Sequence, residues 1–291
     1  MSIPSISLEG KVALVTGGRR GIGEACALVF AEAGADVAVS DWVVDTGELA
    51  AVAEKIKKLG RRSVSIEADV KDKSDIDEMM QRVMDELGTI DILVNNAGVT
   101  DAGQSPEPAD FNPEEARARA LERMALLETS ATVIELDDEA WDKVLENNLK
   151  SVLLCSRAVA KIMVKRKSGN IINIASVRAF AGGRGALAAY SISKRGIVML
   201  TEGLAGDLGK YNIRVNAIAP GAIQTEMMRF AWTDPERTKM LADRTPLSDT
   251  LLAPSACAHT ALYLASDLST YVTGQTIIVD GGLMLTQTGL L

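Results

Sequence analysis

The chain has few of the residues that metal sites, disulfide frameworks and histidine-based catalysis require. Its 291 residues include one histidine, His259, and three cysteines that stand singly in helical patterns. A lone histidine argues against a His-based triad or a transition-metal site. We therefore predict no metal site, and we expect the cysteines to be small buried hydrophobic residues in a reducing, cytoplasmic compartment.

Long apolar runs and an excess of positive charge are missing as well. No apolar stretch approaches the roughly 20 residues of a membrane-spanning helix. The first residues lack the basic and then apolar pattern of a secretory signal. The formal net charge of −8 argues against nucleic acid or an anionic membrane as a partner, so a small molecule is the expected ligand.

What the chain does have is a regular alternation of short apolar runs and helical patterns. The runs lie at residues 11–16, 36–40, 63–67, 90–95, 170–175 and 214–219. Such alternation implies an α/β architecture, in which a parallel sheet carries helices on both faces as a three-layer sandwich. With 47% hydrophobic residues, the chain is suited to one domain of this kind, and we expect residues 1–291 to form it.

A glycine-rich turn joins the first run to the first helical pattern, which we expect at 24–33. Residues 16–23 read T-G-G-R-R-G-I-G. Glycines let the backbone approach a pyrophosphate, and a helix N-terminus offers free N–H groups and the positive end of its dipole. Although the spacing is G-x-x-x-G-x-G, the order of strand, turn and helix favours a dinucleotide site over a plain turn.

The second run ends at Asp41, where a carboxylate can accept hydrogen bonds from the adenosine ribose of a dinucleotide. The same charge would repel a 2′-phosphate, which favours NAD over NADP. Arg19 and Arg20 in the glycine turn argue the other way, because they could attract that phosphate. Trp42 follows Asp41, where a phosphate site would more usefully carry a base. We give Asp41 more weight and predict NAD.

Tyr190 and Lys194 are four residues apart, a spacing that places both on one face of a helix. An adjacent ammonium favours phenolate, so we expect the pKa of Tyr190 to lie below its usual value of about 10. Such a pair suits proton transfer to or from an alcohol or carbonyl oxygen. Alone, the pattern is weak, because a tyrosine and a lysine often share an ordinary surface face.

With these residues in view, the chain resembles the short-chain dehydrogenase/reductase family from about residue 8 to residue 282. Any one matching motif is weak, but their order along the chain is specific. The motifs are T-G-x-x-x-G-I-G from Thr16, Asp69-Val70, Asn95-Asn96-Ala97-Gly98, Asn148, Ser176, Tyr190-x-x-x-Lys194, Pro220-Gly221 with Thr225, and Val279-Asp280-Gly281-Gly282.

The resemblance implies a Rossmann-type doubly wound parallel sheet of about seven strands. It also implies that Tyr190 is the general acid or base, that Ser176 holds the substrate oxygen, that Lys194 binds the nicotinamide ribose and lowers the pKa of Tyr190, and that Asn148 holds a relay water. Asn147 leaves a one-residue ambiguity, which the match to Leu149 and Lys150 settles for Asn148. The residues implied in cofactor binding are Thr16, Gly17, Arg19, Arg20, Gly21, Ile22, Gly23, Asp41, Asp69, Val70, Asn96, Ala97, Gly98, Tyr190, Lys194, Pro220, Gly221, Ile223 and Thr225.

Three segments depart from the family or vary within it. The chain is longer than the family pattern at 101–136, where an asparagine cap and a proline predict an extra helix over 113–128 at the rim of the active site. That helix would be either a cap over the substrate or a surface or subunit-contact helix. Residues 222–253 match the substrate-binding lobe of the family. The third segment lies between Ser176 and Tyr190 and contains Arg178 and Arg184. These two arginines would bind an acidic substrate or, as we favour, be solvated loop residues.

We therefore predict a cytoplasmic, NAD-dependent oxidoreductase that transfers a hydride between the cofactor and a secondary alcohol or ketone. The alternatives are an NADPH-dependent 3-oxoacyl (carrier protein) reductase and a catalytically silent nucleotide-binding protein. The family also implies a homotetramer. The helices expected at 139–166 and 189–209 carry apolar residues on more than one side, which a second partner would cover.

Overall fold

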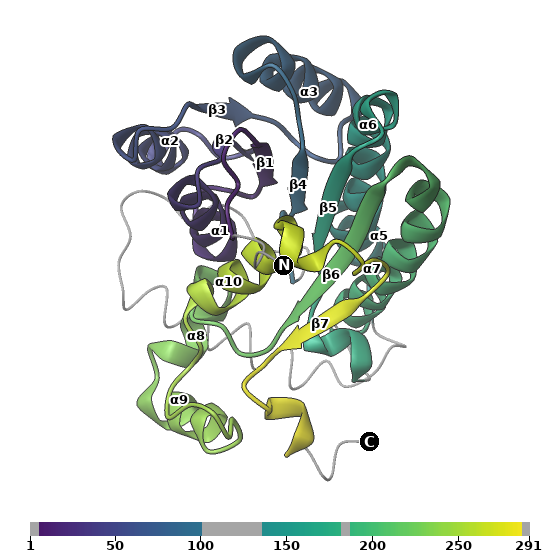
Figure 1. Ribbon diagram of the computed structural model, residues 1–291. Helices are drawn as coiled ribbons and strands as arrows, with labels where there is room; N and C mark the ends of the chain where they lie inside the picture. Colours follow the sequence, from purple (N-terminus) through teal and green to yellow (C-terminus); the bar gives the residue numbers. More distant parts are fainter. Residues whose placement is uncertain (1–5, 101–135, 182–186, 287–291) are drawn as a thin grey trace.

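The computed structural model describes residues 6–100, 136–181 and 187–286. Seven parallel strands form one sheet in the order β3-β2-β1-β4-β5-β6-β7. Both the predicted α/β class and the doubly wound parallel sheet are therefore confirmed (Figure 1). The strands are β1 Val12–Thr16, β2 Asp36–Asp41, β3 Ser63–Glu67, β4 Ile92–Asn95, β5 Gly169–Ile174, β6 Ile213–Pro220 and β7 Thr276–Val279.

Helices cover both faces of this sheet. One face carries α1, α2 and α10, and the other carries α3, α6 and α7. The shorter α8 and α9 lie beyond the carboxyl end of β6 (Figure 1). The helices are α1 Gly21–Glu32, α2 Glu48–Lys58, α3 Lys73–Leu87, α5 Asp138–Leu145, α6 Ser151–Arg166, α7 Leu187–Leu208, α8 Arg229–Trp232, α9 Pro235–Ala242 and α10 Pro254–Ala265.

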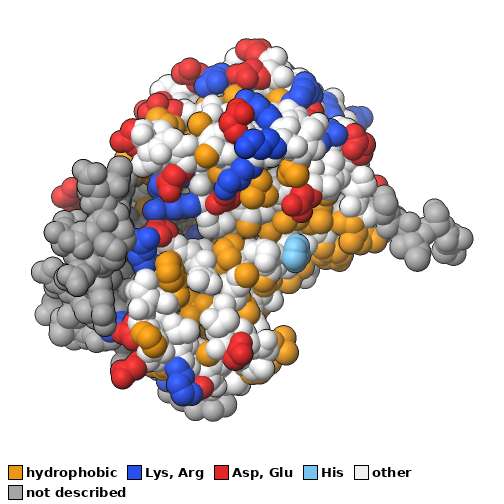
Figure 2. Space-filling model, turned by 90° about the vertical axis from the view of Figure 1, so that its left-hand side faces the viewer, with side chains coloured by type: hydrophobic (Ala, Val, Ile, Leu, Met, Phe, Trp, Pro, Cys, Tyr) orange, Lys and Arg blue, Asp and Glu red, His pale blue; other side chains and the backbone are white. Residues whose placement is uncertain are grey.

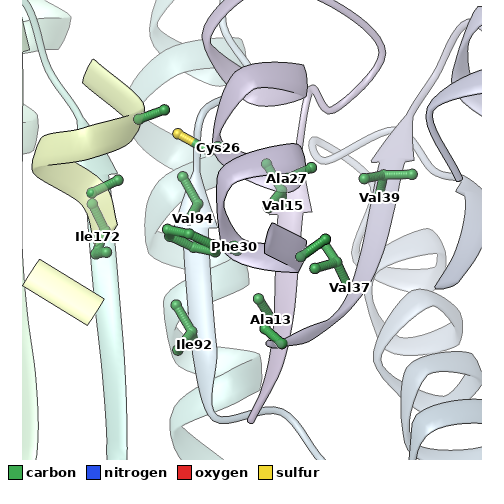
Figure 3. Packing of buried hydrophobic residues seen from close by; sticks show 14 of the residues in the cluster. Ala13, Val15, Cys26, Ala27, Phe30, Val37, Val39, Ile92, Val94 and Ile172 are labelled. Atoms are coloured by element: carbon green, nitrogen blue, oxygen red, sulfur yellow. The ribbon is translucent and has the colours of Figure 1, made fainter. Parts of the chain in front are cut away.

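The two halves of the core follow from the period of two along each strand. Ala13 and Val15 of β1 face the α1 side, where Phe30 of α1 lies over β1 and β4 (Figure 3). Val12 and Leu14 face the α3 side instead. Because both faces are covered, the strands are apolar throughout, and this is why they read as continuous runs in the sequence.

Two predicted helices have different bounds from those expected. The first helix begins at Gly21 rather than at residue 24, since the last part of the glycine turn already has helical geometry. The helix expected at 139–166 is interrupted by a π-helical turn, Glu146–Lys150, between α5 and α6. The helix expected at 113–128 lies outside the described residues.

Nothing in the described part of the chain resembles a membrane span, because none of its helices is both long and apolar enough. On the face shown in Figure 2, acidic and basic side chains are interspersed rather than gathered by sign.

Candidate active site and cofactor site

The predicted site residues meet at the edge of the sheet formed by the carboxyl ends of its strands. The chain reverses its direction of winding between β1 and β4, and ligands of open α/β sheets bind at such a point. The residues at or just after the strand ends are Gly17 after β1, Asp41 on β2, Asp69 after β3, Asn96 after β4, Ser176 after β5 and Gly221 after β6.

The glycine turn is bonded to the segment that follows β4. The Thr16 hydroxyl accepts hydrogen bonds from the backbone N–H groups of Asn96 at 3.1 Å and Ala97 at 3.2 Å. The Asn96 side chain donates to the carbonyl of Gly17 at 2.9 Å. A Cβ at Gly23 would lie 2.2 Å from the Gly17 oxygen, so only glycine fits there. These contacts hold two distant segments together as one floor of the site.

The N-terminus of α1 opens onto this floor. Arg20 precedes the helix in an extended conformation and no side chain of the described residues caps it, so the first N–H groups are available to an anion. Gly21 has a φ of 62°, and a Cβ there would lie 3.2 Å from the Thr225 methyl group. The loop after β6 therefore faces the glycine turn. This geometry fits the pyrophosphate of a dinucleotide.

At the other end of the cofactor site, Asp41 is largely buried, and burial raises the pKa of its carboxyl. The backbone N–H of Val43, 3.1 Å from Asp41 Oδ1, and the charge of Arg19 lower that pKa in turn. Arg19 is buried and also donates to Glu48, a residue that the sequence analysis did not identify. No pattern marks Glu48, because its contact with Arg19 crosses 29 positions of the chain.

Asp69 and Val70 lie in the turn between β3 and α3. Asp69 Oδ1 accepts from the backbone N–H of Lys71 at 3.0 Å, and the Asp69 N–H donates to Asp75 Oδ2 at 2.9 Å. Val70 is buried against the core. The turn thereby holds the Asp69 carboxylate, which is partly exposed, at the carboxyl edge of the sheet.

Tyr190 and Lys194 project from α7 into the same region, as their spacing predicted. Both side chains are buried, and the Lys194 ammonium lies 5.6 Å from the centre of the Tyr190 ring. Lys194 Nζ donates to the carbonyl of Ile174, the last residue of β5, at 2.9 Å. The Tyr190 hydroxyl lies close to the Ser176 side chain, which is also buried and favours ionisation of the phenol. Serine, tyrosine and lysine thus form one cluster.

The expected effect of Lys194 on Tyr190 is not what the structure shows. Burial raises the pKa of Tyr190 above its usual value, whereas the nearby Ser176 side chain and the charge of Arg178 lower it in part. Burial also lowers the pKa of Lys194, to about 8. The charge of the ammonium favours phenolate, but removal of water from both groups opposes ionisation of each, and this effect cannot be read from their spacing.

An apolar shell explains that burial. Ala189 and Tyr190 pack with Val144 of α5, and Val99, Leu136 and Trp141 complete the cluster. The shell shields the phenol from water, which is why burial raises its pKa. A hydroxyl in such a setting is well placed to exchange a proton with a bound oxygen atom.

Asn148 is fully buried in the π-helical turn and has three hydrogen bonds. Its Oδ1 accepts from the Val99 N–H at 2.8 Å, and its Nδ2 donates to the Val99 carbonyl at 2.8 Å and to Ser193 Oγ at 3.1 Å. Asn147 instead donates back along the helix to Lys143. A π turn re-aims side chains, and here it directs Asn148 toward the cluster. Ser193, which also donates to the Tyr190 carbonyl, was not among the predicted site residues.

The segment after β6 forms the remaining wall. Gly221 donates to the Val279 carbonyl at 2.9 Å, and a Cβ there would lie 2.6 Å from Asp280 Cβ, so glycine permits the close approach. Ile223 pairs with Leu252, which closes the loop that contains α8 and α9. A cleft of about 540 Å³ lies between α1, the start of α2, this loop and the start of α10, and its lining includes Arg20, Gly21, Glu48 and Thr225.

Part of the longer segment and one of the two loop arginines predicted near the substrate lie outside the described residues. The longer segment at 101–136 falls almost entirely outside the described residues, as does Arg184. Arg178 is described, and it is exposed beside Ser176, whose hydroxyl accepts a hydrogen bond from its backbone N–H at 3.2 Å.

Comparisons with known proteins agree with this geometry. A family model described as enoyl-(acyl carrier protein) reductase matches residues 17–284. The 2-dehydro-3-deoxy-D-gluconate 5-dehydrogenase of Dickeya dadantii is 37% identical over 283 residues, which is 97% of this chain and 98% of that protein. A 3-oxoacyl-[acyl-carrier-protein] reductase of Thermotoga maritima is 36% identical over 279 residues, covering 96% and 99%.

A solved structure from Beutenbergia cavernae, described as a putative NAD(P)-dependent gluconate 5-dehydrogenase with bound NADP at low occupancy, has a TM-score of 0.76 at 32% identity and covers 96% of this chain and 99% of that one. The chain belongs to the short-chain dehydrogenase/reductase family. It is an oxidoreductase that uses a nicotinamide cofactor to interconvert an alcohol and a ketone.

Proposed function

We propose that this protein is an NAD-preferring dehydrogenase of secondary alcohols in which Tyr190 exchanges the proton of the substrate oxygen. The observation that carries the proposal is the buried cluster in which Tyr190 lies beside both Ser176 and Lys194. A catalytically silent nucleotide-binding protein would not require these three groups to be buried together.

In the oxidative direction, Ser176 and Tyr190 bind the substrate hydroxyl, and Tyr190, ionised as the phenolate, removes its proton and becomes the neutral phenol. A bound nicotinamide would accept the hydride from the carbinol carbon. Lys194, anchored on the Ile174 carbonyl, holds a positive charge near the phenol and would donate to the nicotinamide ribose. Asn148 and Ser193 keep α7 in register with the segment after β4.

The Tyr190→Phe variant tests the proposal. General acid–base steps contribute about 10²–10⁴ in rate, so we expect kcat to fall by roughly a thousandfold while the Kd for the cofactor changes only a few-fold. Tyr271→Phe is the matched control, since Tyr271 is fully exposed. Turnover by Tyr190→Phe within tenfold of the unmutated enzyme would exclude the proposed base.

The preference for NAD is supported by the carboxylate of Asp41 at the expected ribose position. We expect Asp41→Ala to weaken NAD binding and to improve NADP binding, because the repulsion of a 2′-phosphate is removed. The NADP bound to the Beutenbergia cavernae structure and the exposed Arg20 favour the alternative, an NADPH-dependent reductase. Preference of the unmutated enzyme for NADP would establish that alternative.

For the substrate, the loop at 222–253 and the longer segment at 101–136 are the proposed specificity elements. Arg178 adds a positive charge near Tyr190, and the Dickeya dadantii relative is named for a sugar acid. A panel of secondary alcohols assayed with NAD should therefore include hydroxy acids beside neutral alcohols. Faster turnover of the acids, lost in Arg178→Gln, would identify Arg178 as a substrate contact.

We also propose a homotetramer in the cytoplasm. Leu153 of α6, Ile192 and Met199 of α7, and Ile278 of the edge strand β7 are large apolar residues that remain exposed in the single chain. Their positions on α6, α7 and an edge strand fit contacts with further copies of this chain. All three cysteines are buried and unpaired, which supports a reducing compartment. A monomeric mass by light scattering at micromolar concentration would contradict the tetramer.

A further inference from the structure

Arg19 is a buried cation that lies between two carboxylates at the adenosine end of the site. Its side chain is 7% exposed; one guanidinium nitrogen, Nη1, donates to Glu48, and Nε lies 3.8 Å from Asp41 Oδ2. Glu48 is the first residue of α2, and Asp41 is the last residue of β2. The Arg19 guanidinium therefore interacts with one carboxylate at the end of the strand and with another at the start of the helix.

Arg19 Nε is a buried donor with no hydrogen-bond acceptor among the described residues. A separation of 3.8 Å from Asp41 is too long for a hydrogen bond, for which about 2.7–3.2 Å is usual. Buried donors normally have an acceptor, and one without it points to an acceptor on a ligand. A hydroxyl between the two groups would accept from Nε and donate to the carboxylate.

A ribose 2′-hydroxyl has the donor and the acceptor that this pair of groups requires. A 2′-phosphate lacks the proton for Asp41 and adds negative charge close to two carboxylates. With Arg19, Asp41 and Glu48 all ionised, the three groups carry a net charge of −1, and they become neutral together if Glu48 loses its charge. Glu48 therefore opposes a 2′-phosphate in two ways, by its own charge and by its hold on Arg19.

We propose that Glu48 is a specificity-determining residue of the cofactor site, which selects a free ribose 2′-hydroxyl over a 2′-phosphate by holding Arg19 beside Asp41. This inference rests on the proposed nicotinamide dinucleotide site but not on the proposed catalytic residues. Arg20 is exposed and lines the cleft with Glu48, near enough to Glu48 and Asp41 to interact with both charges. It remains available to phosphate groups that both cofactors share.

The test is calorimetric titration of the full-length protein with NAD and NADP in the absence of substrate, for the unmutated chain and for Glu48→Gln. Glutamine keeps the size of the side chain and removes its charge. We expect the ratio of the two Kd values to move about five- to tenfold toward NADP, because a half-exposed carboxylate acts on a phosphate through a high effective dielectric. Circular dichroism checks that Glu48→Gln is folded.

Glu54→Gln is the matched control on the same helix, since Glu54 is exposed and bonds only to Lys57 among the described residues. It should leave the ratio of Kd values unchanged. In an Arg19→Gln background, Glu48→Gln should lose most of its effect, because Glu48 acts largely through Arg19.

Three results would overturn the inference. Glu48→Gln could leave the ratio unchanged, it could weaken both cofactors equally, or it could keep its full effect in the Arg19→Gln background. Failure of the proposed function looks different, because Tyr190→Phe would then retain turnover whatever the two Kd values are. If the unmutated chain binds neither nucleotide, both proposals fall together.

Discussion

Replacement of Asn148 by alanine should destabilise the protein and slow its reaction, whereas the same change at Asn147 should do little. The Asn148 side chain has three hydrogen bonds inside the protein, two to the backbone of Val99 and one to Ser193. Ser193 keeps its bond to the Tyr190 carbonyl at 2.7 Å in the variant and loses little. The change in unfolding free energy should therefore come from the two Val99 groups.

A buried polar group left without its partner costs about 1–3 kcal/mol. Val99 is half-buried, so water can replace part of what is lost, and we expect Asn148→Ala to lower the unfolding free energy by about 2–4 kcal/mol. Asn147→Ala removes only a bond along the helix to Lys143 and should stay within about 0.5 kcal/mol of the unmutated protein.

Urea denaturation, followed by tryptophan fluorescence at one protein concentration, measures both variants. A parallel assay should show a lower kcat for Asn148→Ala, since the loss also frees the chain around Gly98, where a Cβ would lie 3.0 Å from Asn148 Oδ1. A decrease in unfolding free energy of less than about 0.5 kcal/mol for Asn148→Ala would refute the reasoning, because the three hydrogen bonds would then contribute no net stability.

Two further predictions concern Tyr190 and the glycine turn. The charge of Arg178 lowers the raised pKa of Tyr190, so Arg178→Gln should raise that pKa further and move the pH profile of alcohol oxidation to higher pH. Arg195→Gln is the control, and identical pH profiles for the two variants would contradict the prediction. Gly23→Ala should abolish cofactor binding in calorimetric titration, since its Cβ would lie 2.2 Å from a backbone oxygen of the turn; NAD binding at normal affinity would show that the turn can rearrange. In the control Gly203→Ala on α7, the new Cβ would meet no atom of the described residues within 4 Å, so this change should stabilise the protein by about 1 kcal/mol.

Much of the fold could be predicted from the order of residues, because both faces of the sheet are buried and each strand is a continuous apolar run. β1 and β3 were located to within one residue in this way. The bounds of helices were harder to predict. The π turn at Glu146–Lys150 leaves the helical pattern nearly unchanged, because one extra residue per turn can be absorbed over so short a segment.

Part of the candidate site could likewise be predicted from the order of residues, and part of it could not. Glycine spacing, the Tyr190 and Lys194 pair, and the position of Asp41 depend on local chain geometry, so the order of residues was enough to predict which of them meet at the carboxyl edge. Burial and charge pairing depend on segments far apart in the chain. Only the tertiary structure could show that burial raises the pKa of Tyr190, and that Glu48, 29 positions away, holds Arg19 beside Asp41.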